Sequence, residues 1–154
     1  MDRLAGFLAA HAAVGLDTSL FIYHLEDVAP YATVTGAILA SLVQAGFMGV
    51  TSVISLMEIT VQPLARGLTD VATEYESAIS RLPNLTVVPI TRAAARQAAE
   101  LRSVYRIRPA DALQMGACLT HGATGFITND RDLTRVRELE VLVLADIAEA
   151  TGEA

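Results

Sequence analysis

The sequence predicts an α/β fold in which a parallel β-sheet is covered by helices on both faces. Two observations lead to this class. Short apolar runs alternate with longer segments of helical character, and most of the runs are apolar throughout rather than alternating in polarity. The first pattern is typical of strand–helix–strand units, and the second is typical of strands buried on both faces. A length of 154 residues with 53% apolar content is enough for one domain with a large core.

The apolar runs are the predicted strands, and polar residues follow several of them directly. The runs are Ala13–Leu16, Phe47–Val50, Thr86–Val88, Thr124–Ile127 and Val141–Leu144. The carboxyl ends of parallel strands meet at one edge of the sheet, where such folds bind their ligands. We therefore expect the functional crevice at that edge.

The segments between the runs carry the start and stop signals of helices. Gly46 is a predicted helix stop, and Pro63 and Pro83 are each predicted to end the helix that precedes them. A further helix is expected to begin near Leu20, and a short one to cover 131–136. The remaining predicted helices are Val34–Ala45, Ser52–Val61, Val71–Arg81, Thr91–Tyr105 and one that Pro109 opens and Gly122 closes.

The ends of the chain are predicted to lie outside the domain, with 1–12 as an N-terminal extension, 13–150 as the domain and 151–154 as a C-terminal tail. The extension superficially resembles a secretory signal, but Asp2 cancels the charge of Arg3. No apolar run approaches the roughly 18 residues of a membrane span. A single cysteine, Cys118, fits a reducing compartment. We expect a cytoplasmic protein without membrane contact.

Two acids follow predicted strands, Asp17 directly and Asp130 after two intervening residues. Asp17 can cap the helix that begins near Leu20, or Ser19 can cap it and leave Asp17 facing the crevice. Asp130 lies in "GFITNDRDL", where it or Asn129 can cap the short helix that follows. Each acid alone therefore has a purely structural interpretation.

Two further acids lie in predicted helices. Glu58 has capping-box spacing from Ser55, but it lies about two turns into a helix that begins at Ser52. Asp111 is the third residue of the helix that Pro109 opens, where a negative charge suits the helix dipole. A lone acid in such apolar surroundings must be paired or bind a ligand if it is buried.

Taken together, the four acids come from separate elements that end at the same crevice. Two carboxylates about 5 Å apart repel by about 3 kcal/mol at an effective dielectric near 20, so protons or cations must neutralise such a group. A site of oxygen ligands suits Mg²⁺ or Mn²⁺ rather than Zn²⁺. The three histidines lack the spacing of metal ligands, and His121 fits a helix C-terminus.

The order and context of these acids resemble the PIN-domain ribonucleases, and most of all the VapC toxins of bacterial toxin–antitoxin pairs. The matching segments span nearly the whole chain. They are "LDTSLFIYHLE" at 16–26, "TSVISLMEI" at 51–59, "RLPNLTVVPITRAAARQAAELRSVY" at 81–105, "RPADALQMGACL" at 108–119 and "GFITNDRDL" at 125–133. One departure is the leader, since such toxins usually begin a residue or two before the first strand. Here 1–12 is either an extra helix or the product of an upstream start codon.

The resemblance implies a three-layer PIN-like sandwich with five parallel strands in the order 3-2-1-4-5. It also implies an acidic quartet that binds Mg²⁺ or Mn²⁺, with auxiliary polar residues beside it. The quartet is Asp17, Glu58, Asp111 and Asp130, and the auxiliary residues are Thr128, Asn129, Asp132 and Ser19.

The expected function is metal-dependent endonucleolytic cleavage of RNA, with Asp17 and Asp111 as the main metal ligands. Metal-activated water would leave 5′-phosphate and 3′-OH ends. One alternative is a catalytically silent PIN-like binding module. Another is a phosphatase or phosphotransfer domain with Asp17 as nucleophile, which the absence of lysine disfavours because the similar enzymes use one.

The net charge of -6 disfavours RNA binding, but arginines concentrate in the second half of the chain. They contact phosphates or simply form a solvated face; they are Arg92, Arg96, Arg102, Arg106, Arg108, Arg131, Arg135 and Arg137. The resemblance implies a homodimer held inactive by a VapB-like antitoxin. Apolar residues in 54–59 and 64–68 can form the contact surface or belong to the core.

Overall fold

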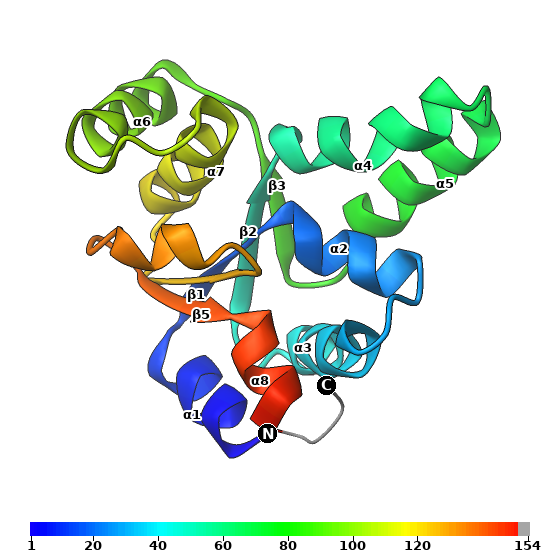
Figure 1. The fold of residues 1–154 in the computed structure, drawn as a ribbon, viewed down its shortest axis with the longest axis horizontal. Helices are drawn as coiled ribbons and strands as arrows, with labels where there is room; N and C mark the ends of the chain where they lie inside the picture. The colour runs from blue at the N-terminus through cyan, green and yellow to red at the C-terminus, as the bar shows by residue number, and fades with distance from the viewer. Residues whose placement is uncertain (151–154) are drawn as a thin grey trace.

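The computed structural model describes residues 1–150 and contains a five-stranded parallel sheet between helical layers (Figure 1). The strand order is β3-β2-β1-β4-β5, so the predicted α/β class and strand order are confirmed. In chain order the elements are α1 (Asp2–Ala10), β1 (Ala13–Leu16), α2 (Thr18–Leu25), α3 (Tyr31–Val43), β2 (Met48–Ser52), α4 (Val53–Ala65), α5 (Thr69–Ser80), β3 (Leu85–Val88), α6 (Arg92–Tyr105), α7 (Pro109–Thr120), β4 (Gly125–Thr128), the 3₁₀ helix η1 (Arg131–Arg135), β5 (Glu140–Val143) and α8 (Leu144–Ala150).

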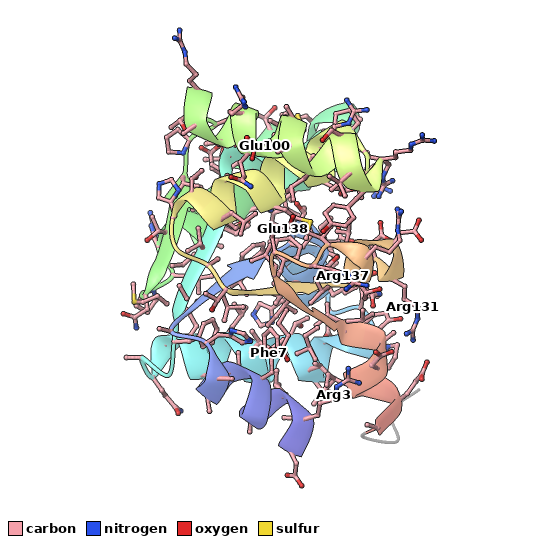
Figure 2. All side chains as sticks on the ribbon, turned by 90° about the vertical axis from the view of Figure 1, so that its left-hand side faces the viewer. Arg3, Phe7, Glu100, Arg131, Arg137 and Glu138 are labelled. Carbon is pink, nitrogen blue, oxygen red and sulfur yellow. The ribbon has the colours of Figure 1, made fainter. Side chains whose placement is uncertain are left out.

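Two apolar cores lie on opposite faces of the sheet. Val14 and Leu16 of β1 belong to the core that α1, α2, α3 and α8 cover. Val50 and Phe126 belong to the other core, which α6 and α7 cover. Figure 2 shows the α6–α7 pair on one side of the sheet and α1 on the other. Burial on both faces explains why the strands read as continuous apolar runs.

The α6–α7 pair packs closely because α7 carries a glycine at the contact. A Cβ built on Gly116 would lie 2.8 Å from the carbonyl oxygen of Ala94 and 3.0 Å from the amide nitrogen of Ala98. Ala94, Ala98 and Leu101 are buried, as the apolar stripe over 91–105 predicts. This contact fixes the N-terminus of α7, and with it Asp111, relative to the sheet.

The N-terminal extension is an additional helix, which is one of the two expected alternatives. Leu4, Phe7 and Leu8 of α1 are buried against the sheet, and Phe7 points into the interior (Figure 2). His11 then bridges two residues of the sheet edge, with Nδ1 2.9 Å from Thr124 Oγ1 and Nε2 3.0 Å from Glu140 Oε2. Residues 1–10 are therefore part of the folded core.

Two helix ends differ from the sequence prediction. Pro63 lies inside α4 rather than beyond its end, because in the last turn its missing N–H removes a single helical bond. Gly67, at φ 72°, ends that helix instead. The helix α3 ends at Val43, two residues before the predicted end, and Ala45 takes the left-handed conformation just before Gly46, the predicted helix stop. The amide of Gly46 donates to Ser41 O, which completes the motif.

The C-terminal part of the chain contains one helix that the sequence analysis missed. The apolar run predicted as a strand over 141–144 covers the end of β5, but Leu144 already begins α8. The predicted C-terminal tail, 151–154, lies outside the described residues. Within residues 1–150, none of the helices combines the length and the apolar character that a membrane span requires.

Candidate functional site

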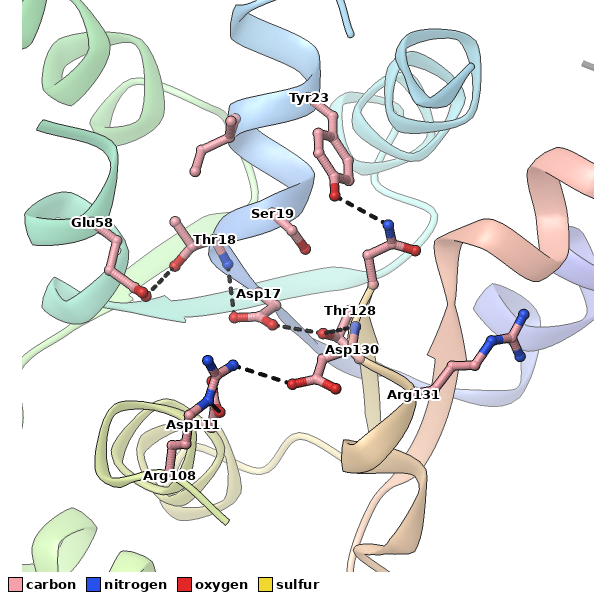
Figure 3. Close-up of a pocket in the computed structure, with 12 residues that line it drawn as sticks. Asp17, Thr18, Ser19, Tyr23, Glu58, Arg108, Asp111, Thr128, Asp130 and Arg131 are labelled. Atoms are coloured by element: carbon pink, nitrogen blue, oxygen red, sulfur yellow. Dashed lines mark hydrogen bonds and ion pairs between the residues drawn. The ribbon is translucent and has the colours of Figure 1, made fainter. Parts of the chain in front are cut away.

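The four predicted acids line one pocket of about 430 Å³ at the carboxyl edge of the sheet (Figure 3). Asp17 follows β1, and Asp130 follows β4 by two residues. Glu58 comes from α4 and Asp111 from α7, on either side of the strand ends. We call this the acidic pocket, defined by these four residues. Four segments far apart in the sequence therefore converge, as expected for the carboxyl edge of a parallel sheet.

Three of these acids also lie at helix N-termini. Asp17 is the N-cap of α2 and accepts a hydrogen bond from the amide of Thr18. Asp130 is the N-cap of η1, and Asp111 lies in the first turn of α7. The positive end of a helix dipole stabilises a nearby negative charge. Capping and pocket lining are thus compatible, and the suggestion that Ser19 replaces Asp17 as the cap is wrong.

Glu58 does not close a capping box. Ser52 is the N-cap of α4, so Glu58 lies in the second turn, and the capping-box interpretation with Ser55 is wrong. The hydroxyl of Thr18 donates to Glu58 Oε1 at 2.8 Å. This bond joins the start of α2 to α4 and orients the carboxylate toward the pocket.

A buried polar cluster lies directly beneath the acidic pocket, formed by Thr51, Ser52, Ser55 and Gln114. The relative exposure of each residue is 0%. The amide nitrogen of Gln114 donates to Ser55 Oγ at 2.7 Å and to Thr51 Oγ1 at 3.1 Å, while Gln114 Oε1 accepts from Ser52 Oγ. Thr51 Oγ1 donates to Leu16 O at 2.8 Å. The cluster ties β1, β2, α4 and α7 together below the carboxylates.

Asp17 is the most deeply set of the carboxylates. Burial raises the pKa of Asp17 to about 6, and the charges of Asp111 and Glu58 add to this rise. Hydrogen bonds from Thr128 Oγ1, at 2.6 Å, and from the amide of Thr18 oppose it. A carboxylate that resists ionisation in this way is stabilised in its charged form by a bound cation.

One cation of the chain itself already contacts the acidic pocket. Arg108 Nε donates to Asp111 Oδ2 at 2.9 Å, and Arg108 Nη2 donates to Asp130 Oδ2 at 3.2 Å (Figure 3). The hydrogen bond to Asp111 raises the pKa of Arg108. The side chain of Arg108 is 76% exposed, so solvent screens these ion pairs and the guanidinium can leave at small cost.

The pocket also contains an unsatisfied donor. Ser19 Oγ is buried and makes no hydrogen bond within residues 1–150, and its side chain lies at the pocket (Figure 3). A buried polar atom without a partner indicates a missing water or ion. The potential metal-ligand atoms in the pocket are carboxylate and hydroxyl oxygens, which suit Mg²⁺ or Mn²⁺.

The carboxylates nevertheless do not form a closed metal cage. Among residues 1–150 no group of three or more His, Cys, Asp or Glu side chains is arranged so that it could hold a metal ion. Mg²⁺ is usually held by one or two carboxylates and several waters, so a full protein cage is not required. The residues of the pocket therefore fit a hydrated cation.

The auxiliary residues divide between the pocket and its surroundings. Thr128 donates to Asp17, and Asn129 lines the pocket while its amide donates to Tyr23 Oη at 3.1 Å. Asp132 does not line the acidic pocket but an adjoining one. Sequence reasoning gave no role to Thr18 or Gln114. The signal for Gln114 was available, because it is the only amide in an apolar helix and lies three residues after Asp111.

Comparisons with known proteins agree with this fold. A chain in a toxin-antitoxin complex from Klebsiella pneumoniae superposes with a TM-score of 0.62 at 19% identity, covering 85% of this chain and 97% of that one. A chain in the crystal structure of VapBC2 from Rickettsia felis bound to a DNA fragment from their promoter gives 0.70 at 15% identity, covering 85% and 98%. Likenesses at such low identity establish the fold alone.

Sequence comparison gives the family. Curated protein sequences yield no match. The model of the PIN domain matches residues 14–139, which is most of the chain and includes the whole acidic pocket. The chain therefore belongs to the PIN domain family.

Proposed function

We propose that this protein is a metal-dependent endoribonuclease that acts at the acidic pocket. The observation that carries the proposal is the meeting of Asp17, Glu58, Asp111 and Asp130, from four separate segments, in one open pocket. PIN domains are generally nucleases that use divalent metal ions, which supports the same assignment. RNA is the expected substrate because the chain resembles the VapC toxins.

The proposed roles follow the local contacts of each residue. Asp17 and Asp111 would hold Mg²⁺ or Mn²⁺ directly, because they are the less exposed acids on the two sides of the pocket. Asp130, with a side chain 34% exposed, would bind through water. Glu58 is held by Thr18 and would orient or deprotonate the attacking water. Ser19 Oγ would donate to a water or phosphate oxygen in the pocket.

The bound cation would supply an activated water and would stabilise negative charge on the leaving oxygen. The chain supplies a fixed arrangement around it, since Thr128 and the amide of Thr18 hold both oxygens of Asp17. Because water rather than the 2′-OH attacks, the products would carry 5′-phosphate and 3′-OH ends.

The test is cleavage of RNA by the purified protein with Mg²⁺ or Mn²⁺, followed by analysis of the product ends. Cleavage should stop in EDTA and in the Asp111→Asn variant. Asp70→Asn, which removes an acid from the first turn of α5 outside the pocket, is the matched control and should cleave like the parent. Products with 2′,3′-cyclic phosphate, or equal cleavage by Asp111→Asn, would contradict the proposal.

We further propose that the protein is a VapC-like toxin held inactive by a small VapB-like antitoxin. The similar chains from Klebsiella and Rickettsia come from toxin–antitoxin complexes, which supports such a partner. An exposed apolar stripe along α4 and just beyond offers a surface for it. The stripe, with helical spacing, is Val53, Met57, Val61, Leu64 and Leu68, each at least 40% exposed. Such a stripe is typical of a surface that another protein covers.

Co-expression with the product of the adjacent gene tests this surface. Val61→Asp should abolish the complex, because a charge would be buried at its centre. Val104→Asp is the matched control on α6, where Val104 is 68% exposed, and should leave the complex intact. Survival of the complex in Val61→Asp would exclude the stripe. The expected homodimer is tested separately by the mass of the isolated protein in light scattering.

A further inference from the structure

A second pocket, of about 310 Å³, adjoins the acidic pocket, and its charged lining consists of three arginines and three aspartates. The two pockets share Arg108, Asp111 and Asp130, so they form one continuous depression. Arg106 and Arg135 line only the second pocket. We call it the arginine pocket, defined by Arg106, Arg108 and Arg135.

The two outer arginines keep their charge available. Arg135 donates through Nε to Asp132 O at 3.1 Å and through Nη1 to Tyr105 O at 3.0 Å. These backbone carbonyls fix the guanidinium without carrying a compensating formal charge. The guanidinium of Arg106 has no hydrogen bond or ion pair within residues 1–150. Asp132 lines the same pocket and forms no ion pair with either arginine among the described residues.

The backbone places Arg106 at this position. It ends α6 in the left-handed conformation, with φ 54° and ψ 33°, and turns the chain toward the start of α7. The next residue, Ile107, is buried, so the segment is anchored between two exposed arginines. Arg106 and Arg108 therefore both lie at the mouth of the joined pockets, on either side of that anchor.

We propose that Arg106 and Arg135 bind a phosphate of the RNA strand adjacent to the phosphate that is cleaved. This inference rests on the proposed function, because it takes the acidic pocket as the cleavage centre. A strand whose scissile phosphate lies at the acidic pocket continues into a neighbouring depression, and here that depression presents two guanidinium groups. Arginine suits this role because its planar group donates several hydrogen bonds to phosphate oxygens.

A contact to a phosphate that does not react has a specific kinetic signature. It strengthens ground state and transition state alike, so its loss raises KM and leaves kcat unchanged. Each lost phosphate contact also lowers the slope of log affinity against log salt by about 0.7 for a single strand. A merely structural residue would change neither the salt slope nor the dependence on substrate length.

The experiment compares the parent with Arg106→Asn on a single-stranded oligoribonucleotide and on a dinucleotide, which carries only the scissile phosphate. Asparagine tolerates the left-handed backbone, so the fold should be kept. We expect KM on the oligonucleotide to rise about fivefold to tenfold, with kcat within twofold. Cleavage of the dinucleotide should not change. Arg106→Lys, which keeps the charge, should retain most of the salt slope.

Arg81→Asn, at the C-cap of α5 and away from both pockets, is the matched control and should behave like the parent. An unchanged KM and salt slope in Arg106→Asn would overturn the phosphate-binding role of the arginine pocket while the proposed function stands. An equal loss of cleavage on the dinucleotide would do the same. If the parent cleaves no RNA, the proposed function fails. Fluorescence anisotropy of labelled RNA in the Asp111→Asn background then tests the pocket alone, through the same affinity loss and salt slope.

Discussion

On α4, Ser55 belongs to a cluster with no solvent exposure, whereas Glu58, one turn later, lines the open acidic pocket. The helix α7 repeats this arrangement with Gln114 in the cluster and Asp111 in the pocket. The buried polar cluster and the acidic pocket thus take residues from the same two helices, one turn apart. In the cluster, neutral groups hydrogen-bond to one another, whereas in the pocket the carboxylates repel one another.

This difference separates stability from function along two helices. The polar cluster fixes how β1, β2, α4 and α7 meet, which determines where the carboxylates lie. The pocket has a hydroxyl without a hydrogen-bond partner and a carboxylate with a raised pKa, and within residues 1–150 Arg108 is the one side chain that forms ion pairs with two of its acids. Polar and charged groups without full partners, held in place by a hydrogen-bonded cluster beneath them, are typical of a functional site.

The largest expected effect comes from removing one carboxylate of the acidic pocket. Asp111→Asn should lower RNA cleavage by roughly a thousandfold, which corresponds to about 4 kcal/mol of activation free energy. Its free energy of unfolding should stay within about 1 kcal/mol of the parent, because the lost ion pair with the exposed Arg108 is offset by relief of the repulsion between Asp111 and Asp17. Single-turnover cleavage and urea unfolding measure the two quantities. A large loss of stability instead would mean that Asp111, like the buried polar cluster, supports the fold.

The second largest expected effect comes from removing the side-chain amide of Gln114 from the buried polar cluster. Gln114→Leu keeps the volume but leaves three buried hydroxyls without their amide partner, so we expect a loss of about 2–4 kcal/mol in the free energy of unfolding. Cleavage per folded molecule should change only a few-fold. Gln62→Leu, at an exposed position of α4, is the matched control. A Gln114→Leu protein as stable as the parent would show that the cluster does not support the fold.

The titration of Asp17 sharpens the comparison. Its pKa of about 6 in the folded protein exceeds the ordinary aspartate value of 3.8, so the folded state binds more protons between these values and stability falls as pH rises through that window. The parent should lose about 2 kcal/mol relative to Asp17→Asn between pH 4 and pH 7 in EDTA. A stability difference that is independent of pH would contradict the raised pKa.

The smallest expected effect concerns the internal counter-ion. Arg108→Ala should bind Mn²⁺ about threefold to tenfold more tightly in calorimetry, since the guanidinium no longer competes for Asp111 and Asp130. Arg81→Ala is the control for the loss of one positive charge. Weaker binding by Arg108→Ala would mean that Arg108 holds the carboxylates in place rather than competing for them.

Local sequence signals predicted the fold well where burial decides the pattern. Ala13–Leu16 is a strand with the predicted bounds, and Pro109 begins α7 as expected. The signals were less accurate at the ends of helices and strands. α4 continues past Pro63, and Leu144 begins a helix although its apolar run resembles a strand. Whether 1–12 forms a helix stayed open in the prediction, because the apolar face of α1 is explained only by its burial against the sheet.

The four acids of the site could be predicted from the sequence, but the residues that hold them in place could not. Each acid had a local interpretation as a cap, and only their shared position at strand ends indicated a pocket. The hydrogen bond from Thr18 to Glu58 joins residues 40 positions apart, and the one between Ser52 and Gln114 joins residues 62 positions apart, so no local pattern reveals either. The contact of Arg108 with two acids at once also depends on how α7 meets η1.

Binding of Mn²⁺ at pH 7, followed by electron paramagnetic resonance of the free ion, tests the central assignment most directly. The parent and Asp70→Asn should bind Mn²⁺ with equal affinity, and Asp111→Asn should bind it at least about tenfold more weakly, which is about 1.4 kcal/mol. Equal affinity of the parent and Asp111→Asn would contradict the assignment, because Asp111 would then make no contribution to holding the cation.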